Sequence, residues 1–493
     1  MIFEARTDFP KNTIRFYVFD KETKLDHHSI VSDFPGAVTA WQRIPDNKYR
    51  TLFGADGSVA YLFKIDGEIT AAPSDLSGRT GLLEQLGRKV SFREKDRLDK
   101  TLAIYWGPNT NNESGEDKLL AAFTTGILLG TYGVGRYRND EQVHPLAATD
   151  AHVYVLGERS GLVDTMGRAY QIADTRMRCM DLVNAPANKK RPQDLAQWAI
   201  DSGDRFEYDV RVLDKGRCEA EGMHALLAVN RGSEDPARFV IMEYKGENAP
   251  EKPTVIIGKG VTFDTGGISI KGSANLHLMK SDMGGAAAVF GTLETAARLH
   301  LPVNVVGLVP LTDNSVDALS IKPSDVISGH SGKTIEIIDT DAEGRLIMSD
   351  ALSYGATNYD AHTLIDIATL TGSAVRTFGY QCAALFSKNE ELVEELRSAG
   401  NRSGERCWPL PMWDDYKSGL DSDVADIKNY SGKPINGAID AAKFLEIFTH
   451  EHPRFAHIDI AGVAIKAGSY AKDRLATGFG IGLLVSFLEG PRD

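Results

Sequence analysis

The chain has 493 residues, of which 42% are hydrophobic, and carries a formal net charge of −13 at pH 7. A chain of this length can bury a large core and is expected to form two or more domains. Its acidity disfavours wholesale binding to nucleic acid.

The cysteines and the apolar runs predict a soluble, cytoplasmic protein. The four cysteines are widely spaced and form no C-x-x-C pair, which indicates free thiols in a reducing compartment. The first residues, MIFEARTDFPKN, carry acids where a signal peptide would be basic and then apolar. The longest uncharged run, 119–135, is too short and too rich in Gly and Thr to span a membrane. We expect it to be a buried helix.

Residues 1–150 are expected to form a smaller, mixed α/β domain. Short apolar strands are predicted at 14–19, 58–65 and 101–106. This part holds 19 Lys and Arg against 21 Asp and Glu and shows no chemical motif. We expect it to serve oligomerisation or regulation. A linker is predicted at 151–172 and a catalytic domain at 173–493.

From about residue 205, apolar strands and helices alternate. The predicted strands are 239–244, 253–258, 303–311, 334–338, 362–370 and 455–462, and the predicted helices are 284–300, 344–358, 391–400 and 438–448. This alternation predicts a mainly parallel sheet flanked by helices on both faces. In such sheets ligands bind beyond the carboxyl ends of the strands.

The segment IIDTDAEG (337–344) places three acids directly after the predicted strand 334–338. Carboxylates this close repel one another unless a positive charge lies between them. An EF-hand is disfavoured because a strand leads in and Asp350, at the last ligand position, would lie inside a helix. The preceding SGHSGKT lacks the first glycine of a phosphate-binding loop. Taken alone, this segment favours acids that cap the helix near Gly344.

Two further motifs change that balance: GKGVTFDTGGISIK (258–271) and MKSDMGGAA (279–287). All three motifs place charged residues at strand ends or helix starts, next to glycines: Lys259, Asp264, Lys271, Asp282, Asp341, Glu343 and Arg345. Each taken singly is better explained as a turn, a cap or a solvated charge. Together, the carboxylates can bind two divalent cations, which activate a water and stabilise an oxyanion. The oxygen-rich ligand set suits Mn²⁺, Mg²⁺ or Zn²⁺.

These three motifs, in this order and spacing, resemble the leucyl (cytosol) aminopeptidase family, the two-metal M17 peptidases. The resemblance continues in GMHALLAVNRGS (222–233), IDIATLTGSA (365–374), HIDIAGVA (457–464) and ATGFGIGLLVSFL (476–488). It covers about 173–490, and no motif extends it to residues 1–150.

The resemblance implies a role for each matching residue. Asp264 and Glu343 would bridge the two metal ions, Asp341 would complete one site, and Lys259 and Asp282 would complete the other. Lys259 would have to be neutral, with a pKa lowered by the adjacent cation.

The resemblance also implies catalytic and substrate contacts. Lys271 would stabilise the developing gem-diolate, and Arg345 would hold a bicarbonate-like anion. Asp282 would also bind the α-amine of a peptide substrate. Met279, Thr369 and Gly372 would line a pocket for an apolar first side chain such as Leu or Met. The family forms homohexamers.

Asp339 is a visible departure, because the family commonly has asparagine there. An added carboxylate can strengthen cation binding or, when protonated, donate a hydrogen bond.

Other functions stay open. One alternative is a Cys-Gly type dipeptidase of the same fold. A second is a regulatory protein that binds DNA through residues 1–150, which the near-neutral charge of that part does not support. A third is an inactive paralogue, which the retained Lys259, Lys271 and Arg345 argue against.

Overall fold

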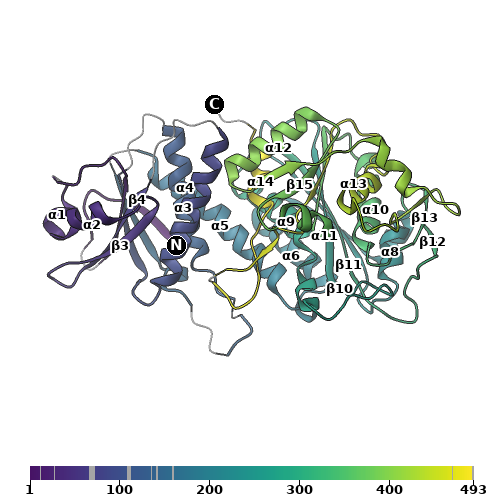
Figure 1. Cartoon of the computed structure of the whole chain (residues 1–493), viewed down its shortest axis with the longest axis horizontal. Coiled ribbons are helices and arrows are strands. Elements are labelled where there is room, and N and C mark those ends of the chain that lie inside the picture. Colours follow the sequence, from purple (N-terminus) through teal and green to yellow (C-terminus); the bar gives the residue numbers. More distant parts are fainter. Residues whose placement is uncertain are drawn as a thin grey trace. The chain divides into compact units, whose positions relative to one another are not determined.

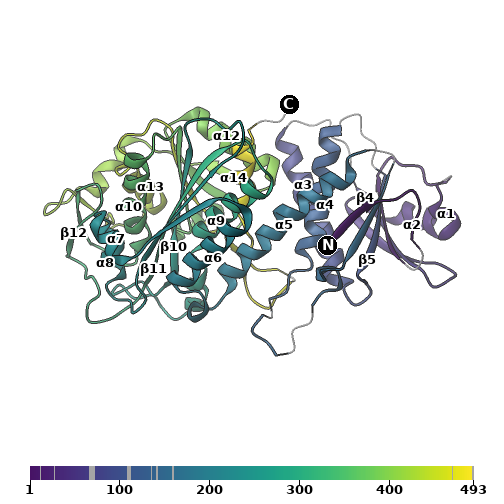
Figure 2. The same cartoon turned by 180° about the vertical axis from the view of Figure 1, so that it is seen from behind.

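The computed structural model describes residues 1–10, 13–26, 28–65, 73–107, 113–134, 136–139, 143–157, 160–468 and 470–490. The chain divides into two compact units, Met1–Met177 and Arg178–Asp493. The first is coloured purple to blue in Figures 1 and 2, and the second teal to yellow. No described helix is long and apolar enough to cross a membrane.

The first unit is a six-stranded sheet with helices on both faces. Its strands lie in the order β1 (Ile2–Ala5), β6 (His152–Leu156), β5 (Thr101–Trp106), β2 (Ile14–Asp20), β4 (Val59–Ile65) and β3 (Lys48–Phe53). All neighbours are parallel except β3 and β4. The helices are α1 (Ile30–Asp33), α2 (Ala37–Arg43), α3 (Pro73–Arg93), α4 (Glu113–Leu129) and the first part of α5 (Leu162–Asn184).

Alternation along β2 explains the two faces of this sheet. Phe16 and Val18 point into the core with α3 and α4, whereas Tyr17 and Phe19 point into the core with α1 and α2. The predicted buried helix at 119–135 corresponds to the apolar end of α4, where Phe123 and Ile127 are buried. The smaller mixed α/β domain is therefore confirmed.

The second unit is built on a nine-stranded sheet. The order is β16 (Cys407–Pro409), β15 (Ala383–Phe386), β18 (Phe455–Asp459), β14 (Thr363–Ala368), β9 (Thr254–Gly258), β11 (Asn304–Asn314), β8 (Arg238–Lys245) and β7 (Asp209–Leu213), with β10 (Gly260–Asp264) beside β11. The four central strands β18, β14, β9 and β11 are mutually parallel. A mainly parallel core sheet was predicted, and it is confirmed.

Helices cover both faces of this sheet (Figures 1 and 2). Gly307 faces Val289 of α9 (Gly284–Arg298), whereas its neighbour Leu308 faces Gly355 of α10 (Glu343–Asn358). Because successive residues of a strand point to opposite faces, α9 and α10 lie on opposite sides. The remaining helices are α6 (Pro192–Phe206), α7 (Lys215–Ala220), α8 (His224–Asn230), α11 (Gly372–Phe378), α12 (Glu390–Ser403), α13 (Gly437–Glu446) and α14 (Ile481–Leu488).

The predicted strand 334–338 is shorter than expected and lies outside the main sheet. β13 (Thr334–Glu336) pairs with β12 (Val326–Ser328) and β17 (Ile427–Lys428) in a separate three-stranded sheet. Beyond its end, the N–H of Ile337 still donates to the carbonyl oxygen of Asp325, and the N–H groups of Ile338 and Asp339 donate to the side-chain oxygen of Asn429. A further pair, β19 (Ile465–Lys466) and β20 (Leu475–Ala476), forms a two-stranded sheet.

The predicted linker 151–172 is also different in the structure. It contains β6, which lies between β1 and β5, and the beginning of α5. Val153 and Val155 are buried in the core of the first unit. This short alternation was missed because polar sequence surrounds it. The boundary between the units instead falls inside α5.

Because α3 and α4 pack closely, replacing two of their glycines by alanine should change stability in opposite directions. A Cβ at Gly126 would lie 2.1 Å from the carbonyl oxygen of Glu84, whereas a Cβ at Gly81 would meet nothing within 4 Å. We expect Gly126→Ala to destabilise the first unit by about 1–3 kcal/mol through overpacking. Gly81→Ala should instead stabilise by about 0.5–1 kcal/mol, since alanine favours a helix. Calorimetric unfolding of both variants tests this, and equal shifts would contradict the packing argument.

Asp350 predicts a pH-dependent contribution to stability. Its buried carboxylate accepts hydrogen bonds from the backbone N–H groups of Leu226 and His330. Burial nevertheless raises its pKa to about 7. Because the folded state disfavours ionisation, the stability contributed by this group falls as pH rises from about 4 to 7.

The destabilisation caused by Asp350→Asn should therefore be larger at pH 5 than at pH 8. Urea unfolding of wild type and variant, both free of metal, at the two pH values measures the difference. A destabilisation that grows with pH would show that the buried carboxylate is stabilised in its ionised form.

Candidate metal centre

The carboxyl ends of three neighbouring parallel strands bring one group of residues together. β9, β14 and β18 are paired in parallel, so they end at the same edge of the sheet. Lys259 directly follows β9, Thr369 follows β14, and Asp459 is the last residue of β18. Ligand sites form at such an edge because several strand ends converge there.

Asp264 reaches the same region from β10. The pairing of β10 with β11 is irregular between Val261 and Asp264, as expected where a bulge re-aims a side chain. One carboxylate oxygen of Asp264 accepts hydrogen bonds from the N–H of Gly266 and from Nδ2 of Asn314, each at 2.9 Å. Asp264 thus stabilises its own turn, as the simpler interpretation proposed, and still presents its second oxygen to the centre.

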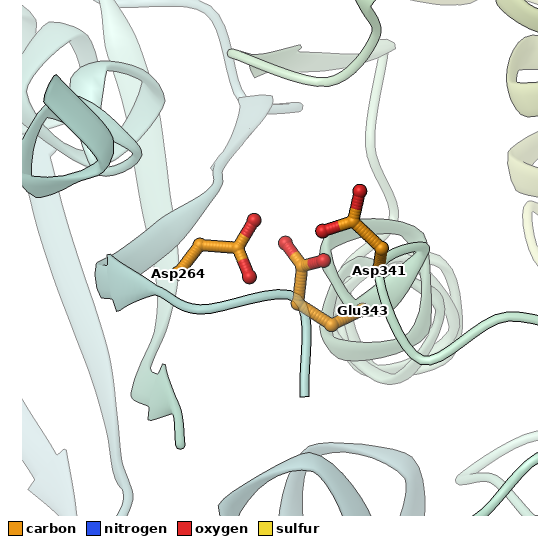
Figure 3. A group of neighbouring side chains, drawn as sticks. All are labelled: Asp264, Asp341 and Glu343. Atoms are coloured by element: carbon orange, nitrogen blue, oxygen red, sulfur yellow. The ribbon is translucent and has the colours of Figure 1, made fainter. Parts of the chain in front are cut away.

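Asp341 and Glu343 come from the beginning of α10. The helix cap is Ala342, and no side chain makes a capping hydrogen bond there. The helix-capping interpretation of these acids is therefore wrong as far as hydrogen bonding is concerned. Instead, one oxygen each of Asp264, Asp341 and Glu343 lies within 4.8 Å of the others, and Figure 3 shows the three carboxylates facing one another.

Two lysines lie between the carboxylates. Nζ of Lys259 lies 2.6 Å from Oδ2 of Asp282 and 2.8 Å from Oε1 of Glu343. Nζ of Lys271 lies 2.8 Å from Oδ2 of Asp264 and also pairs with Asp341. Six of the seven residues singled out as metal or catalytic candidates therefore form one buried or half-buried cluster.

Burial and mutual repulsion shift the acids in this cluster toward their neutral forms. Burial raises the pKa of Asp341 to about 7, with Asp264 adding to the shift and Lys271 opposing it. Burial likewise raises the pKa of Asp282 and of Glu343, while Lys259 opposes both shifts. A site that penalises its own negative charge is one that a cation can stabilise.

The lysines respond in the opposite sense. Burial alone lowers the pKa of Lys259, but Asp282 and Glu343 outweigh it and raise that pKa above the ordinary lysine value. Asp264 and Glu343 raise the pKa of Lys271 against burial in the same way. The prediction of a neutral Lys259 therefore applies to a centre in which cations offset the carboxylate charge.

The donor set fits divalent cations. Glu343 is 1% exposed, and its Oε2 has no hydrogen-bond donor among the described residues. An uncompensated buried carboxylate oxygen is costly unless a ligand compensates it. Carboxylate oxygens from three chain positions suit Mn²⁺, Mg²⁺ or Zn²⁺.

Arg345 lies two residues beyond Glu343 and is buried. Its Nη1 donates to the carbonyl oxygen of Asn429 at 2.9 Å, and its Nε has no partner among the described residues. Burial lowers its pKa, with nearby acids opposing the shift. It therefore retains an unused donor for an anion.

The three residues predicted to line a side-chain pocket lie in different elements near the cluster. Met279 lies in the 3₁₀ helix Leu276–Ser281, and Gly372 is the first residue of α11. The hydroxyl of Thr369 donates to Asp282 at 2.8 Å, and its carbonyl oxygen accepts from Lys259. A common pocket for an apolar side chain stays a prediction.

Sequence reasoning missed two asparagines and one aspartate. Asn314 bonds Asp264, Asn429 bonds the segment before Asp341, and Asp459 bonds the loop after Thr369. Asn314 and Asp459 end apolar strands, a signal that could have found them. Asn429 follows a two-residue strand in a polar stretch, and nothing local distinguishes it.

Comparisons with known proteins agree with this arrangement. Residues 177–485 match the family described as "Cytosol aminopeptidase family, catalytic domain". The chain is 44% identical over 382 residues to a probable cytosol aminopeptidase of Chlorobaculum tepidum, covering 76% of each chain. It is 37% identical over 455 residues to one of Chlorobium limicola, covering 89% of this chain and 90% of that protein.

A solved structure extends the similarity to the first unit. The bottromycin maturation enzyme BotP in complex with Mn superposes with a TM-score of 0.80 at 28% identity, covering 97% of this chain and 98% of that one. The carboxylate cluster lies within the matched catalytic region. The chain therefore belongs to the cytosol aminopeptidase family, whose members are metal-dependent peptide hydrolases.

Proposed function

We propose that this chain is a two-metal aminopeptidase that removes an apolar N-terminal residue, such as Leu or Met, from peptides. The observation that carries the proposal is the approach of Asp264, Asp341 and Glu343 within 4.8 Å of one another. The two lysines among them and the family membership of the chain support it.

The residues of the cluster would form two adjoining metal sites. Asp264 and Glu343 would be shared by both ions, as the family resemblance implies. In support, Glu343 contacts Lys259, and its charge raises the pKa of Lys271. Asp341 would complete one site, and Lys259 with Asp282 the other. Mn²⁺ or Zn²⁺ is our first choice and Mg²⁺ the next; BotP, which resembles this chain, was solved with Mn.

The bound ions would polarise the scissile carbonyl and lower the pKa of an attacking water. The chain's own groups supply the rest. The neighbouring carboxylates favour the ammonium form of Lys271, which would stabilise the oxyanion that develops on the substrate carbonyl. Arg345 would hold a bicarbonate-like anion with its unused donor.

Asp282 explains the restriction to N-termini. Its carboxylate is 8% exposed, and its oxygens contact Lys259 and the hydroxyl of Thr369. The free α-amine of a peptide would bind one metal ion and Asp282, whereas the lone pair of an acylated nitrogen is delocalised and would not bind a metal ion. Thr369, with Met279 and Gly372, would line the pocket for the first side chain.

We also propose that the chain acts in the cytoplasm as a homohexamer, with residues 1–150 in an assembly or regulatory role. No observation on the described residues favours a Cys-Gly dipeptidase, a DNA-binding regulator or an inactive paralogue.

Metal binding should depend on Glu343. After treatment with chelator, the wild-type chain should bind two Mn²⁺ ions in calorimetric titration. Mn²⁺ at 100 times its dissociation constant should raise the free energy of unfolding by about 2.7 kcal/mol per site. Glu343→Gln should weaken the binding of both ions, because it removes the negative charge and one oxygen of a shared carboxylate.

Glu446→Gln is the matched control, since Glu446 pairs with Lys388 and Lys443 outside the cluster. Unchanged binding of both ions by Glu343→Gln would refute its bridging role.

Activity should be restored to the stripped chain by metal. The stripped chain receives one ion at a time: Mn²⁺, Zn²⁺, Mg²⁺ or Co²⁺. We expect the ions to restore hydrolysis of leucine p-nitroanilide to different extents, and the N-acetylated substrate not to be hydrolysed. Lys271→Gln should lower kcat by about 10²–10³-fold, as expected when an oxyanion donor is lost. The exposed Lys322→Gln serves as control. If a folded, metal-binding chain hydrolyses the leucine substrate with none of these metals, the proposed leucine aminopeptidase activity is wrong.

A further inference from the structure

We infer that Asp459 and Asn429 are positioning residues, each supporting a different half of the carboxylate cluster. Asp459 supports the half that contains Lys259 and Asp282, and Asn429 supports the half that contains Asp341. The inference rests on the proposed function, because it uses the assignment of these residues to two metal sites.

Asp459 holds the loop that follows β14. It is 1% exposed and ends β18, next to β14 in the sheet. Its Oδ1 accepts from the N–H groups of Leu370 (3.2 Å) and Ala461 (3.0 Å), and its Oδ2 accepts from the hydroxyl of Thr371 (2.7 Å). One buried carboxylate thus fixes two consecutive residues of the loop.

Thr369 connects this loop to the cluster through two hydrogen bonds. It directly precedes Leu370 and makes two contacts with predicted ligands. Its carbonyl oxygen accepts from Nζ of Lys259 at 3.2 Å, and its hydroxyl donates to Oδ1 of Asp282 at 2.8 Å. A shift of the loop would therefore move the partners of both Lys259 and Asp282. Asp341 instead pairs with Lys271, and its N–H donates to Asp339.

Asn429 holds the segment that leads to Asp341. It is fully buried, and all its side-chain polar atoms are used. Oδ1 accepts from the N–H groups of Ile338 (2.8 Å) and Asp339 (3.3 Å), and Nδ2 donates to the carbonyl oxygen of Asp339 at 2.6 Å. Asp339 in turn accepts from the N–H of Asp341 at 2.9 Å. Asn429 therefore holds the backbone segment that leads into Asp341.

Asn429 also supports Arg345, through its main chain. Nη1 of Arg345 donates to the carbonyl oxygen of Asn429 at 2.9 Å, and the N–H of Asn429 donates to Glu336. This anchor survives replacement of the Asn429 side chain, so a side-chain variant reports on the Asp341 segment.

The two supports use separate hydrogen bonds. Asp459 acts through 369–371 and Asn429 through 338–341, and no residue belongs to both sets of contacts. Residues that orient metal ligands typically change metal affinity 10- to 100-fold when replaced. Loss of either support should therefore weaken one bound ion far more than the other.

The test is calorimetric Mn²⁺ titration of the stripped full chain. We expect the wild-type chain to bind two ions. Asp459→Asn and Asn429→Ala should each raise the dissociation constant of one ion about 10- to 100-fold, and should change that of the other ion less than about threefold. Apo-protein melting curves accompany each titration. If either variant does not fold, Thr371→Val replaces Asp459→Asn, and Asn429→Ser replaces Asn429→Ala.

Double variants identify which ion is weakened. In an Asp282→Asn background, Asp459→Asn should reduce Mn²⁺ affinity little further, whereas Asn429→Ala should reduce it as much as it does in the wild-type chain. In an Asp341→Asn background the pattern should reverse, because only coupled residues are non-additive.

Equal weakening of both ions, or none, in folded variants would overturn the inference and leave the proposed function intact. Fewer than two ions bound by wild type would overturn the proposed function, and the inference with it.

Discussion

The structure depends on the buried electrostatic contact between Lys259 and the carboxylates of Asp282 and Glu343. These groups are at most 8% exposed, so neither sign of charge is stabilised by water. Isolated charges at such depth would be strongly destabilising, and each is tolerated only because its counter-charge is within 3 Å. The fold must therefore deliver lysine and acids to the same place with little freedom. That requirement explains the dense hydrogen bonding around them.

Parallel strands satisfy the requirement. β9, β14 and β18 end at one edge of the sheet, which carries Lys259, Thr369 and Asp459. Helices α9 and α10 then begin near this edge on opposite faces, preceded by Asp282 and by Asp341. Gly285 permits the approach of α9, since a Cβ there would lie 2.1 Å from the carbonyl oxygen of Ile367. This glycine of the second motif thus serves the packing of α9 against the sheet.

The three-stranded sheet changes how Asp341 is understood. The β-branched residues 334–338 predicted a strand of the main sheet, but β13 pairs with β12 and β17 instead. Intrinsic preference shows that a segment is extended and leaves its partner open. One partner comes from residues 427–428, and the side chain of Asn429, directly after them, bonds the backbone of residues 338 and 339. Asp341 is therefore positioned by a segment about ninety residues away in sequence.

The sequence alone determined the two-part α/β organisation, the central strands and helices of the second unit, and six charged residues that the fold gathers. Long apolar runs with clear periodicity and glycine-flanked acids carry that information locally. The tertiary structure alone decided which lysine pairs with which carboxylates, and that α10 begins without a side-chain capping hydrogen bond. It also decided that 152–156 is a strand and that Asn314, Asn429 and Asp459 bond residues of the cluster or the segments beside it. Those features arise from contacts between distant segments, and local patterns of polarity do not specify which buried polar group will satisfy another.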